Sequence, residues 1–252
     1  MMSTIHTAVI LAAGRGRRLE AYCDEQPKPM TQVNGISIIE NLVTQINRAG
    51  IQKIVLVVGY LASVLIEHLE NAFSDQTIDW IFVDNPIYAT TNNIYSLWLA
   101  KDFLQHGFYL FEADVFCEQQ IVSQLIQHAK ENVMVVGKFT EQMNGTVVSL
   151  TPQNIVDRMF LKRNQTADFS FDKKYKTVNF YKVGKTFANE FFLKKMDEHI
   201  QNEDLNSYYE LIIQEAVRSK YVFHGLKTGK SKWWEIDTPE DLKIAEDIFH
   251  GK

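Results

Sequence analysis

Short runs of β-branched residues alternate with segments of helical periodicity through the first half of the chain, and this alternation limits the folds open to it. The runs at 7–11, 54–58, 78–83 and 108–113 have the length of buried strands. The segments at 37–48, 61–69 and 93–104 carry apolar residues at helical spacing, and Ser37 and Glu40 are placed as a capping box with Gly50 past the helix end. Strands separated by helices of this length predict a parallel sheet covered on both faces.

The second half has a different pattern. Strand-like segments at 133–139, 145–150, 155–161 and 177–183 follow one another with little helix between them. Segments 186–199 and 208–218 are helical, and Thr238 and Pro239 open a final helix. No linker rich in Gly, Ser or Pro divides the 252 residues. We therefore expect a single α/β domain over 1–252, with a Rossmann-like, mostly parallel sheet and an antiparallel, β-rich extension.

Charge and hydropathy exclude several classes of protein. The formal net charge of −5 argues against a nucleic-acid partner, because binding to phosphate backbones requires a basic face. The longest apolar stretch, 54–66, falls short of the roughly 18 residues that a membrane span needs, and no secretory signal opens the chain. Cys23 and Cys117 lie far apart with no CxxC partner, which indicates free thiols. We expect a cytoplasmic protein without membrane insertion.

A glycine-rich loop follows the first predicted strand. Residues 11–19 read Leu-Ala-Ala-Gly-Arg-Gly-Arg-Arg-Leu. Small residues let the backbone approach a ligand closely, and successive N–H groups can cradle a phosphate. Three arginines add positive charge there. The spacing fits neither a Walker A loop nor a dinucleotide fingerprint, and the alternative is a plain tight turn.

The residues after this loop carry a resemblance. Pro27-Lys28-Pro29-Met30 follows, and then Val33-Asn34-Gly35-Ile36-Ser37-Ile38-Ile39-Glu40. This order of motifs resembles the sugar-phosphate and phosphocholine nucleotidyltransferase family, which implies a nucleotide-diphospho-sugar transferase-like fold. It also implies that Arg18 and Lys28 are catalytic and contact the reacting phosphates. The threonine often found in the family between loop and Pro-Lys is missing from 20–26. The implied nucleotide-binding residues of the loop are Leu11, Ala12, Ala13, Gly14, Arg15 and Gly16.

Two aspartates follow predicted strands that are far apart in the sequence. Asp114 comes directly after the strand at 108–113, and Asp237 precedes the final helix. The resembled family has an aspartate in each place, and the pair holds Mg²⁺ there; two carboxylates suffice for Mg²⁺ when phosphates and water supply the other ligands. The alternatives are a turn aspartate for Asp114 and a helix cap for Asp237. Glu112 and Glu235 alternate with these aspartates and point to the same face.

A second motif concerns the nucleotide base. Asn92-Asn93-Ile94-Tyr95-Ser96-Leu97, preceded by Asn85, resembles the helix start of bacterial choline-phosphate and phosphonate cytidylyltransferases. The resemblance places Asn85, Asn92, Asn93 and Ser96 at the nucleotide and favours CTP. Asparagine offers a donor and an acceptor, which matches cytosine. The alternative for Asn92 is a simple N-cap.

Two further segments predict the acceptor site. The segments 176–182 (Lys-Thr-Val-Asn-Phe-Tyr-Lys) and 206–210 (Asn-Ser-Tyr-Tyr-Glu) resemble the phosphonate-cytidylating branch. Lysines would hold the acceptor phosphate, and aromatic or acidic side chains a cationic head group. Two alternatives stay open: Ser207 and Glu210 form a capping-box pattern, and paired tryptophans are often core residues. The candidate acceptor residues are Lys138, Lys176, Tyr181, Tyr209, Glu210, Trp234 and Glu235.

Together these motifs predict a Mg²⁺-dependent cytidylyltransferase. It would transfer CMP from CTP to a small phosphorylated or phosphonate acceptor, such as phosphocholine or 2-aminoethylphosphonate, and release pyrophosphate. The alternatives are a sugar-1-phosphate nucleotidyltransferase that uses another NTP, a metal-dependent glycosyltransferase, and a non-catalytic regulatory subunit with the same fold. A homodimer is compatible with this interpretation.

Overall fold

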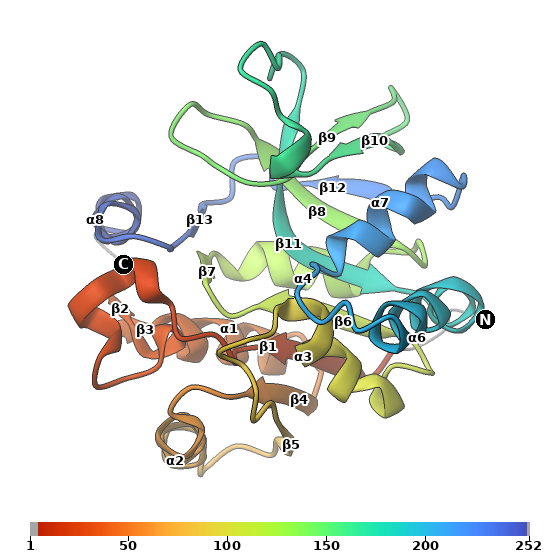
Figure 1. The fold of residues 1–252 in the computed structure, drawn as a ribbon. Helices are drawn as coiled ribbons and strands as arrows, with labels where there is room; N and C mark the ends of the chain where they lie inside the picture. The colour runs from red at the N-terminus through yellow and green to blue at the C-terminus, as the bar shows by residue number, and fades with distance from the viewer. Residues whose placement is uncertain (1–4, 251–252) are drawn as a thin grey trace.

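The protein is built around a nine-stranded mixed sheet that runs through both halves of the chain (Figure 1). The computed structural model describes residues 5–250, with the exception of the side chains of Glu20 and Ala21. The strands lie in the order β10-β9-β11-β6-β1-β4-β5, and β8 and β12 extend the sheet beside β11. Their bounds are β1 Thr7–Leu11, β4 Lys53–Val58, β5 Asp79–Asp84, β6 Phe108–Glu112, β8 Val133–Lys138, β9 Val147–Leu150, β10 Val156–Phe160, β11 Tyr175–Val183 and β12 His224–Lys227.

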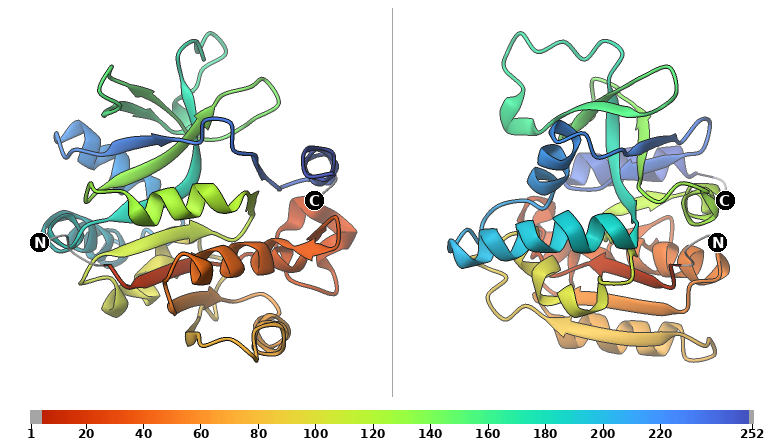
Figure 2. Two further views of the ribbon diagram at one scale, coloured as in Figure 1. Left: turned by 180° about the vertical axis from the view of Figure 1, so that it is seen from behind. Right: turned by 90° about the vertical axis from the view of Figure 1, so that its right-hand side faces the viewer.

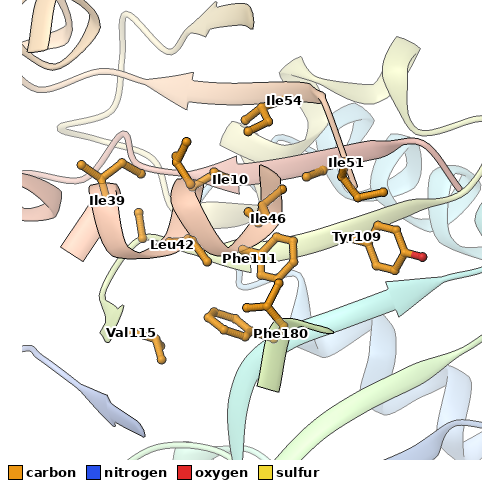
Figure 3. Packing of buried hydrophobic residues seen from close by; sticks show 14 of the residues in the cluster. Ile10, Ile39, Leu42, Ile46, Ile51, Ile54, Tyr109, Phe111, Val115 and Phe180 are labelled. Carbon is orange, nitrogen blue, oxygen red and sulfur yellow. The ribbon is translucent and has the colours of Figure 1, made fainter. Parts of the chain in front are cut away.

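The first half forms the parallel part of the sheet, as predicted. Strand β1 pairs in parallel with β4 and β6, and β4 pairs in parallel with β5. Helices α1 (Ile38–Arg48), α2 (Ala62–Ala72) and α4 (Gln119–Gln127) pack on one face, and α3 (Asn93–Leu99), α6 (Leu193–Gln201) and α7 (Glu210–Arg218) on the other. Figure 3 shows Ile10 and Phe111 of the sheet against Ile39 and Leu42 of α1. The carboxyl ends of β1, β4 and β6 therefore share one edge, where ligands of such sheets bind.

Local sequence signals explain the bounds of the best-predicted helices. Ser37 and Glu40 form the predicted capping box of α1, and Gly50 takes a φ of 92° just past its end. Thr238 caps α8 (Pro239–Ile248), with proline at the first helical position. These side chains satisfy backbone N–H groups that the helix leaves without partners.

The second half forms the antiparallel extension. Strand β11 pairs antiparallel with β6, β8 and β9, and β10 pairs antiparallel with β9. Strand β12, which the sequence pattern did not predict, pairs in parallel with β8. Figure 2 shows this extension standing above the parallel part of the sheet. The antiparallel prediction is confirmed for all of these pairs except β8 with β12.

Three other elements differ from the sequence prediction. Helix α4 was not predicted at all. The helix predicted at 93–104 stops at Leu99 and continues as a short 3₁₀ turn, Lys101–Phe103. The helix predicted at 186–199 consists of α5 (Lys185–Phe187), a π-helical turn (Ala188–Phe192) and α6. The sequence pattern locates the second and third of these helices, but it does not fix where the hydrogen-bond pattern changes.

A small ladder brings the C-terminal segment to the edge of the sheet. Strand β7 (Val115–Cys117) pairs antiparallel with β13 (Trp233–Glu235), and the N–H of Ile236 donates to the carbonyl of Asp114 over 2.8 Å. Helix α8 and β13 share a core cluster with Leu19 of the 3₁₀ segment Arg17–Cys23. In Figure 1 the blue α8 lies beside the red hairpin of β2 (Gln32–Val33) and β3 (Ile36–Ser37). Asp114 and Asp237, remote in sequence, thus meet.

Cys23 and Cys117 are both buried, and no disulfide joins them. None of the helices within residues 5–250 is long and apolar enough to cross a membrane.

Candidate active site

The glycine-rich loop packs closely against the side chain of Lys28 at Gly16. Gly16 has a φ of 69°, and a Cβ at this position would lie 2.7 Å from Cβ of Lys28. A left-handed backbone with no room for a side chain requires glycine here. The loop and Lys28 are therefore packed as one unit at the carboxyl end of β1.

Lys28 joins the two predicted aspartates. Its ammonium Nζ lies 2.9 Å from Oδ2 of Asp114 and 2.7 Å from Oδ1 of Asp237. Arg18 Nη2 lies 2.9 Å from the same oxygen of Asp237. Burial alone would lower the pKa of Lys28, but the two carboxylates outweigh it and raise the pKa. At Asp237 burial would raise the pKa of the carboxyl, but Lys28 and Arg18 lower it, so Lys28 and Asp237 form a charged pair at neutral pH.

Two cavities open on either side of this cluster. The loop cavity, of about 670 Å³, is lined by residues 11–18 and by the start of α3. The β11 cavity, of about 860 Å³, is lined by β11, β13 and the loops at 142–146 and 161–163. Both are lined by Arg18, Asn93, Glu112, Asp114, Tyr208 and Asp237. Two ligands, one in each cavity, would meet at the aspartates.

The loop cavity holds most of the predicted nucleotide residues. Asn85 is outside the lining of both cavities and 1% exposed, and its Nδ2 donates to Thr91 and Ser96. Asn92 acts as an N-cap, since its Oδ1 accepts from the N–H of Asn93. The predicted residues that line the loop cavity are Leu11, Ala12, Ala13, Gly14, Arg15, Gly16, Asn92, Asn93 and Ser96.

Asn93 links the two cavities. Its Nδ2 donates to Glu112 over 3.2 Å and to Glu210 over 3.3 Å, and its Oδ1 accepts from the N–H of Tyr209 over 3.0 Å. The hydroxyl of Tyr209 also donates to Glu112, over 2.8 Å. Burial raises the pKa of Glu112, and the charges of Asp114 and Glu210 raise it further. The side chain of Asn93 thus connects Glu112, which lines both cavities, with Glu210 of the β11 cavity.

A bulge in β11 brings Lys176 and Asn179 into the lining of the β11 cavity. The register between β11 and β8 shifts between Thr177 and Tyr181, and Asn179 inside this bulge has a φ of 61°. Asn179 Nδ2 donates to Glu235 over 3.4 Å, and Lys176 Nζ lies 2.7 Å from the other carboxylate oxygen of Glu235. Burial would lower the pKa of Lys176, but Glu235 raises it. The bulge therefore aims an amide and an ammonium at one carboxylate.

The predicted acceptor residues divide into two groups. Lys176, Glu210, Trp234 and Glu235 line the β11 cavity. Lys138, Tyr181 and Tyr209 lie outside its lining, and both tyrosines are fully buried.

The capping alternative for Glu210 does not apply. Ser207 donates to Asp204 over 2.6 Å, and α7 begins without a side-chain cap. The carboxylate of Glu210 is therefore available to the cavity.

Sequence reasoning gave Glu112 and Asn179 too little weight. Glu112 shares a face with Asp114, and this alternation was the signal for it. Asn179 had a weaker signal, its place within the Lys-Thr-Val-Asn motif, since a left-handed φ inside a strand cannot be read from the residue type. Thr146 also lines the β11 cavity, and no sequence signal marked it, whereas Tyr208, which lines both cavities, belongs to the segment 206–210 that the sequence assigned to the acceptor site.

The cluster meets the requirements of a magnesium site. Among the described residues, no group of three or more His, Cys, Asp and Glu side chains is arranged to hold a metal. Mg²⁺, however, takes one or two carboxylates and completes its shell with phosphates and water. Oδ1 of Asp114 is buried and has no hydrogen-bond partner among the described residues. An unpartnered carboxylate oxygen beside a second carboxylate fits this metal.

Residues 8–167 match the family of the MobA-like NTP transferase domain. The chain belongs to this family. Members of the MobA-like family are nucleotidyltransferases, and the protein is an enzyme of this type. Its mostly parallel sheet flanked by helices agrees with the family's fold. The resemblance predicted from the sequence motifs is thereby confirmed.

The chain is also similar to proteins named as cytidylyltransferases and as a CMP-phosphonate synthase. The choline-phosphate cytidylyltransferase of Streptococcus pneumoniae is 36% identical over 253 residues, which cover 97% of this chain and 99% of the relative. The CMP-5'-(3-aminopropyl)phosphonate synthase of Streptomyces rubellomurinus is 28% identical over 243 residues. That match covers 96% of this chain but only 38% of the relative's length. A solved structure of a CTP:phosphocholine cytidylyltransferase from Streptococcus pneumoniae has a TM-score of 0.78 at 22% identity, covering 97% of this chain and 99% of that one.

Proposed function

We propose that the protein is a Mg²⁺-dependent cytidylyltransferase that transfers CMP from CTP to a small phosphorylated or phosphonate acceptor. The observation that carries this proposal is that two cavities meet at one cluster of Lys28, Asp114 and Asp237. An acceptor oxygen in the β11 cavity attacks the α-phosphorus of CTP in the loop cavity. The bond from this phosphorus to the α,β-bridging oxygen breaks, and pyrophosphate leaves with the electron pair.

The cations of the cluster stabilise the charge that develops in this step. The acceptor oxygen is already an anion at neutral pH, so the reaction requires no general base. The ammonium of Lys28 is held in place by two carboxylates, and the more exposed guanidinium of Arg18 reaches the same site. Fixed positive charge of this kind stabilises the non-bridging oxygens and the leaving pyrophosphate more than it stabilises the ground state. The backbone N–H groups of the glycine-rich loop would hold the triphosphate.

Asp114 and Asp237 would hold Mg²⁺ at the boundary of the two cavities. When bound, the metal would neutralise the repulsion between the acceptor anion and the triphosphate. The two carboxylates fix where such a cation can lie, because one follows β6 and the other follows β13. Lys28 shares these carboxylates, so its ammonium would move toward the phosphates in the loaded enzyme.

The start of α3 would contact the base. Both polar atoms of the Asn93 side chain are already engaged, whereas Nδ2 of Asn92 has no hydrogen-bond partner among the described residues. This amide could donate to N3 or O2 of cytosine, which are acceptors. Ser96 also lines the loop cavity and supplies a hydroxyl. We therefore propose Asn92 and Ser96 as the residues that favour CTP.

The experiment that tests this function measures pyrophosphate release. The enzyme is supplied with Mg²⁺, one of the four NTPs, and either an aminoalkylphosphonate, phosphocholine or a sugar 1-phosphate. Turnover with CTP and a small phosphonate or phosphocholine is the expected result. Preference for another NTP with a sugar 1-phosphate would favour the sugar nucleotidyltransferase alternative. No release with any pair would contradict catalysis by this chain.

A further inference from the structure

Three neighbouring glutamates line the β11 cavity. Glu112 comes from the end of β6, Glu210 from the start of α7, and Glu235 from the end of β13. Glu210 is 8% exposed although it lines the cavity. Three separate elements thus direct acidic groups to one place, next to the aspartates where transfer occurs.

Few positively charged side chains lie near these three glutamates. Lys176 is buried and lies 2.7 Å from Glu235, so its charge is already matched. Among the described residues, neither Glu112 nor Glu210 makes an ion pair; their contacts are the hydroxyl of Tyr209 and the amide of Asn93. The other basic residues of the lining, Arg18, Lys162 and Arg163, are exposed. Buried carboxylates without a cation are costly, so a ligand that brings a positive charge to this place would be stabilised by them.

A buried hydroxyl near these carboxylates is also left without a partner. Tyr181 is fully buried, and its hydroxyl has no hydrogen-bond partner among the described residues. Its ring packs edge-on against Tyr209, whose hydroxyl donates to Glu112. Tyr181 lies outside the lining of the cavity, so of these two unpartnered oxygens it is Oδ1 of Asp114, a lining residue, that is placed to meet a bound ligand.

The aromatic residues argue against a quaternary cation. A trimethylammonium group donates no hydrogen bond and is usually held by the open faces of several rings. Trp233 and Trp234 are 7% and 6% exposed. The indole of Trp233 packs on Gly137, where a Cβ would lie 2.4 Å from it, and Trp234 Nε1 donates to Asp241. Tyr208, at the rim, is the exposed ring of the lining.

We infer that the acceptor carries a primary ammonium group, which donates hydrogen bonds to Glu112, Glu210 and Glu235. A primary ammonium has three N–H donors and one positive charge. Its three N–H groups can therefore donate one hydrogen bond to each of the three carboxylates, and its positive charge offsets their negative charge. The opposite end of the acceptor, its phosphate or phosphonate, then lies toward Asp114 and Asp237. This inference rests on the proposed cytidylyl transfer and names the class of acceptor.

Matched acceptors test the head group. 2-Aminoethylphosphonate, its N-trimethyl analogue and 2-hydroxyethylphosphonate share one phosphonate and one carbon chain. With CTP and Mg²⁺, we expect kcat/KM for the amine to exceed that for the other two by at least about 100-fold, as for buried polar groups left unpaired by the wrong substrate. Equal or better use of the trimethyl analogue would overturn the inference, and so would equal use of the hydroxyl compound.

A variant and its control locate the recognition. In Glu210→Gln, one carboxylate becomes a neutral amide of the same shape, and the amine-to-hydroxyl ratio of kcat/KM should fall by about tenfold or more. Glu215→Gln, on the same helix but paired with Lys195, should leave the ratio unchanged. An unchanged ratio in Glu210→Gln would refute a role for this carboxylate.

Direct binding separates this inference from the proposed function. Isothermal titration of the three phosphonates into the wild-type enzyme with Mg²⁺ requires no turnover. Tighter binding of the amine supports the inference even if pyrophosphate release fails, in which case only the cytidylyl transfer is wrong. Equal binding of all three overturns the inference, whatever the turnover.

Discussion

Replacing Lys28 with methionine would remove the ammonium that lies between the carboxylates of Asp114 and Asp237. The distances are 2.9 and 2.7 Å, and 12% of the lysine side chain is exposed. Removing one partner from ionic groups this buried costs about 3–5 kcal/mol of unfolding free energy. Arg18 remains 2.9 Å from Asp237, so we expect a loss near the lower end, about 3 kcal/mol.

The assay is urea unfolding at pH 7 without divalent cations. Lys195→Met is the matched control, because Lys195 also bridges two carboxylates, Glu198 at 2.9 Å and Glu215 at 3.0 Å. This second bridge lies on the surface, where water and salt screen it, so its loss should destabilise the protein less. A Lys28→Met variant that unfolds at the same urea concentration as Lys195→Met would refute the electrostatic argument.

Magnesium extends the same experiment. Without Lys28, both carboxylates are open to a metal, and binding to the folded state alone stabilises it. Mg²⁺ should therefore raise the unfolding midpoint of Lys28→Met more than that of the wild type, while pyrophosphate release falls by about 100-fold or more. A midpoint that does not respond to Mg²⁺ would argue against these aspartates as its ligands.

Two further changes test the packing of the loop and the hydrogen bonds of Asp204. Gly16→Ala should lower the free energy of unfolding in urea more than Gly35→Ala does. Both glycines have a positive φ, but only at Gly16 would the new Cβ meet Lys28. Equal losses of stability would contradict this clash. Burial would raise the pKa of Asp204, but hydrogen bonds from Ser207 and His199 lower it. The charged carboxylate therefore stabilises the folded state fully above the ordinary pKa of 3.8, and this stabilisation is lost as the pH falls through the lowered pKa. The stability difference between wild type and Asp204→Asn should accordingly shrink on acidification from pH 7, and a difference that grew would show the opposite sign.

The elements that could be predicted from the sequence are those that local chemistry specifies. The capping box of Ser37 and Glu40 fixes the start of α1, and the β-branched runs fix the parallel strands. Asp114 could be placed at the edge of the sheet because it follows a buried strand, and ligands bind at that edge in folds of this kind. The resemblance supplied Asp237, which no local signal distinguished from a helix cap.

The remaining features depend on contacts between distant residues. Asn93 was predicted at the base, and the structure commits its amide to Glu112, Glu210 and the backbone of Tyr209, which are distant in sequence. The left-handed φ of Asn179 follows from the bulge in β11, not from its residue type. Helix α4 was not predicted because its amphipathic segment is short and begins without a side-chain cap.

The pairing of β7 with β13 has a consequence for how the enzyme loses activity on heating. Asp237 lies in the segment between β13 and α8. This segment is attached to the rest of the protein through a three-residue ladder and one helix, outside the nine-stranded sheet. Peripheral units of this kind open before the global transition. Detachment of this segment would separate Asp237 from Asp114 while the rest of the fold stayed native, so activity should be lost at a lower temperature than that of global unfolding.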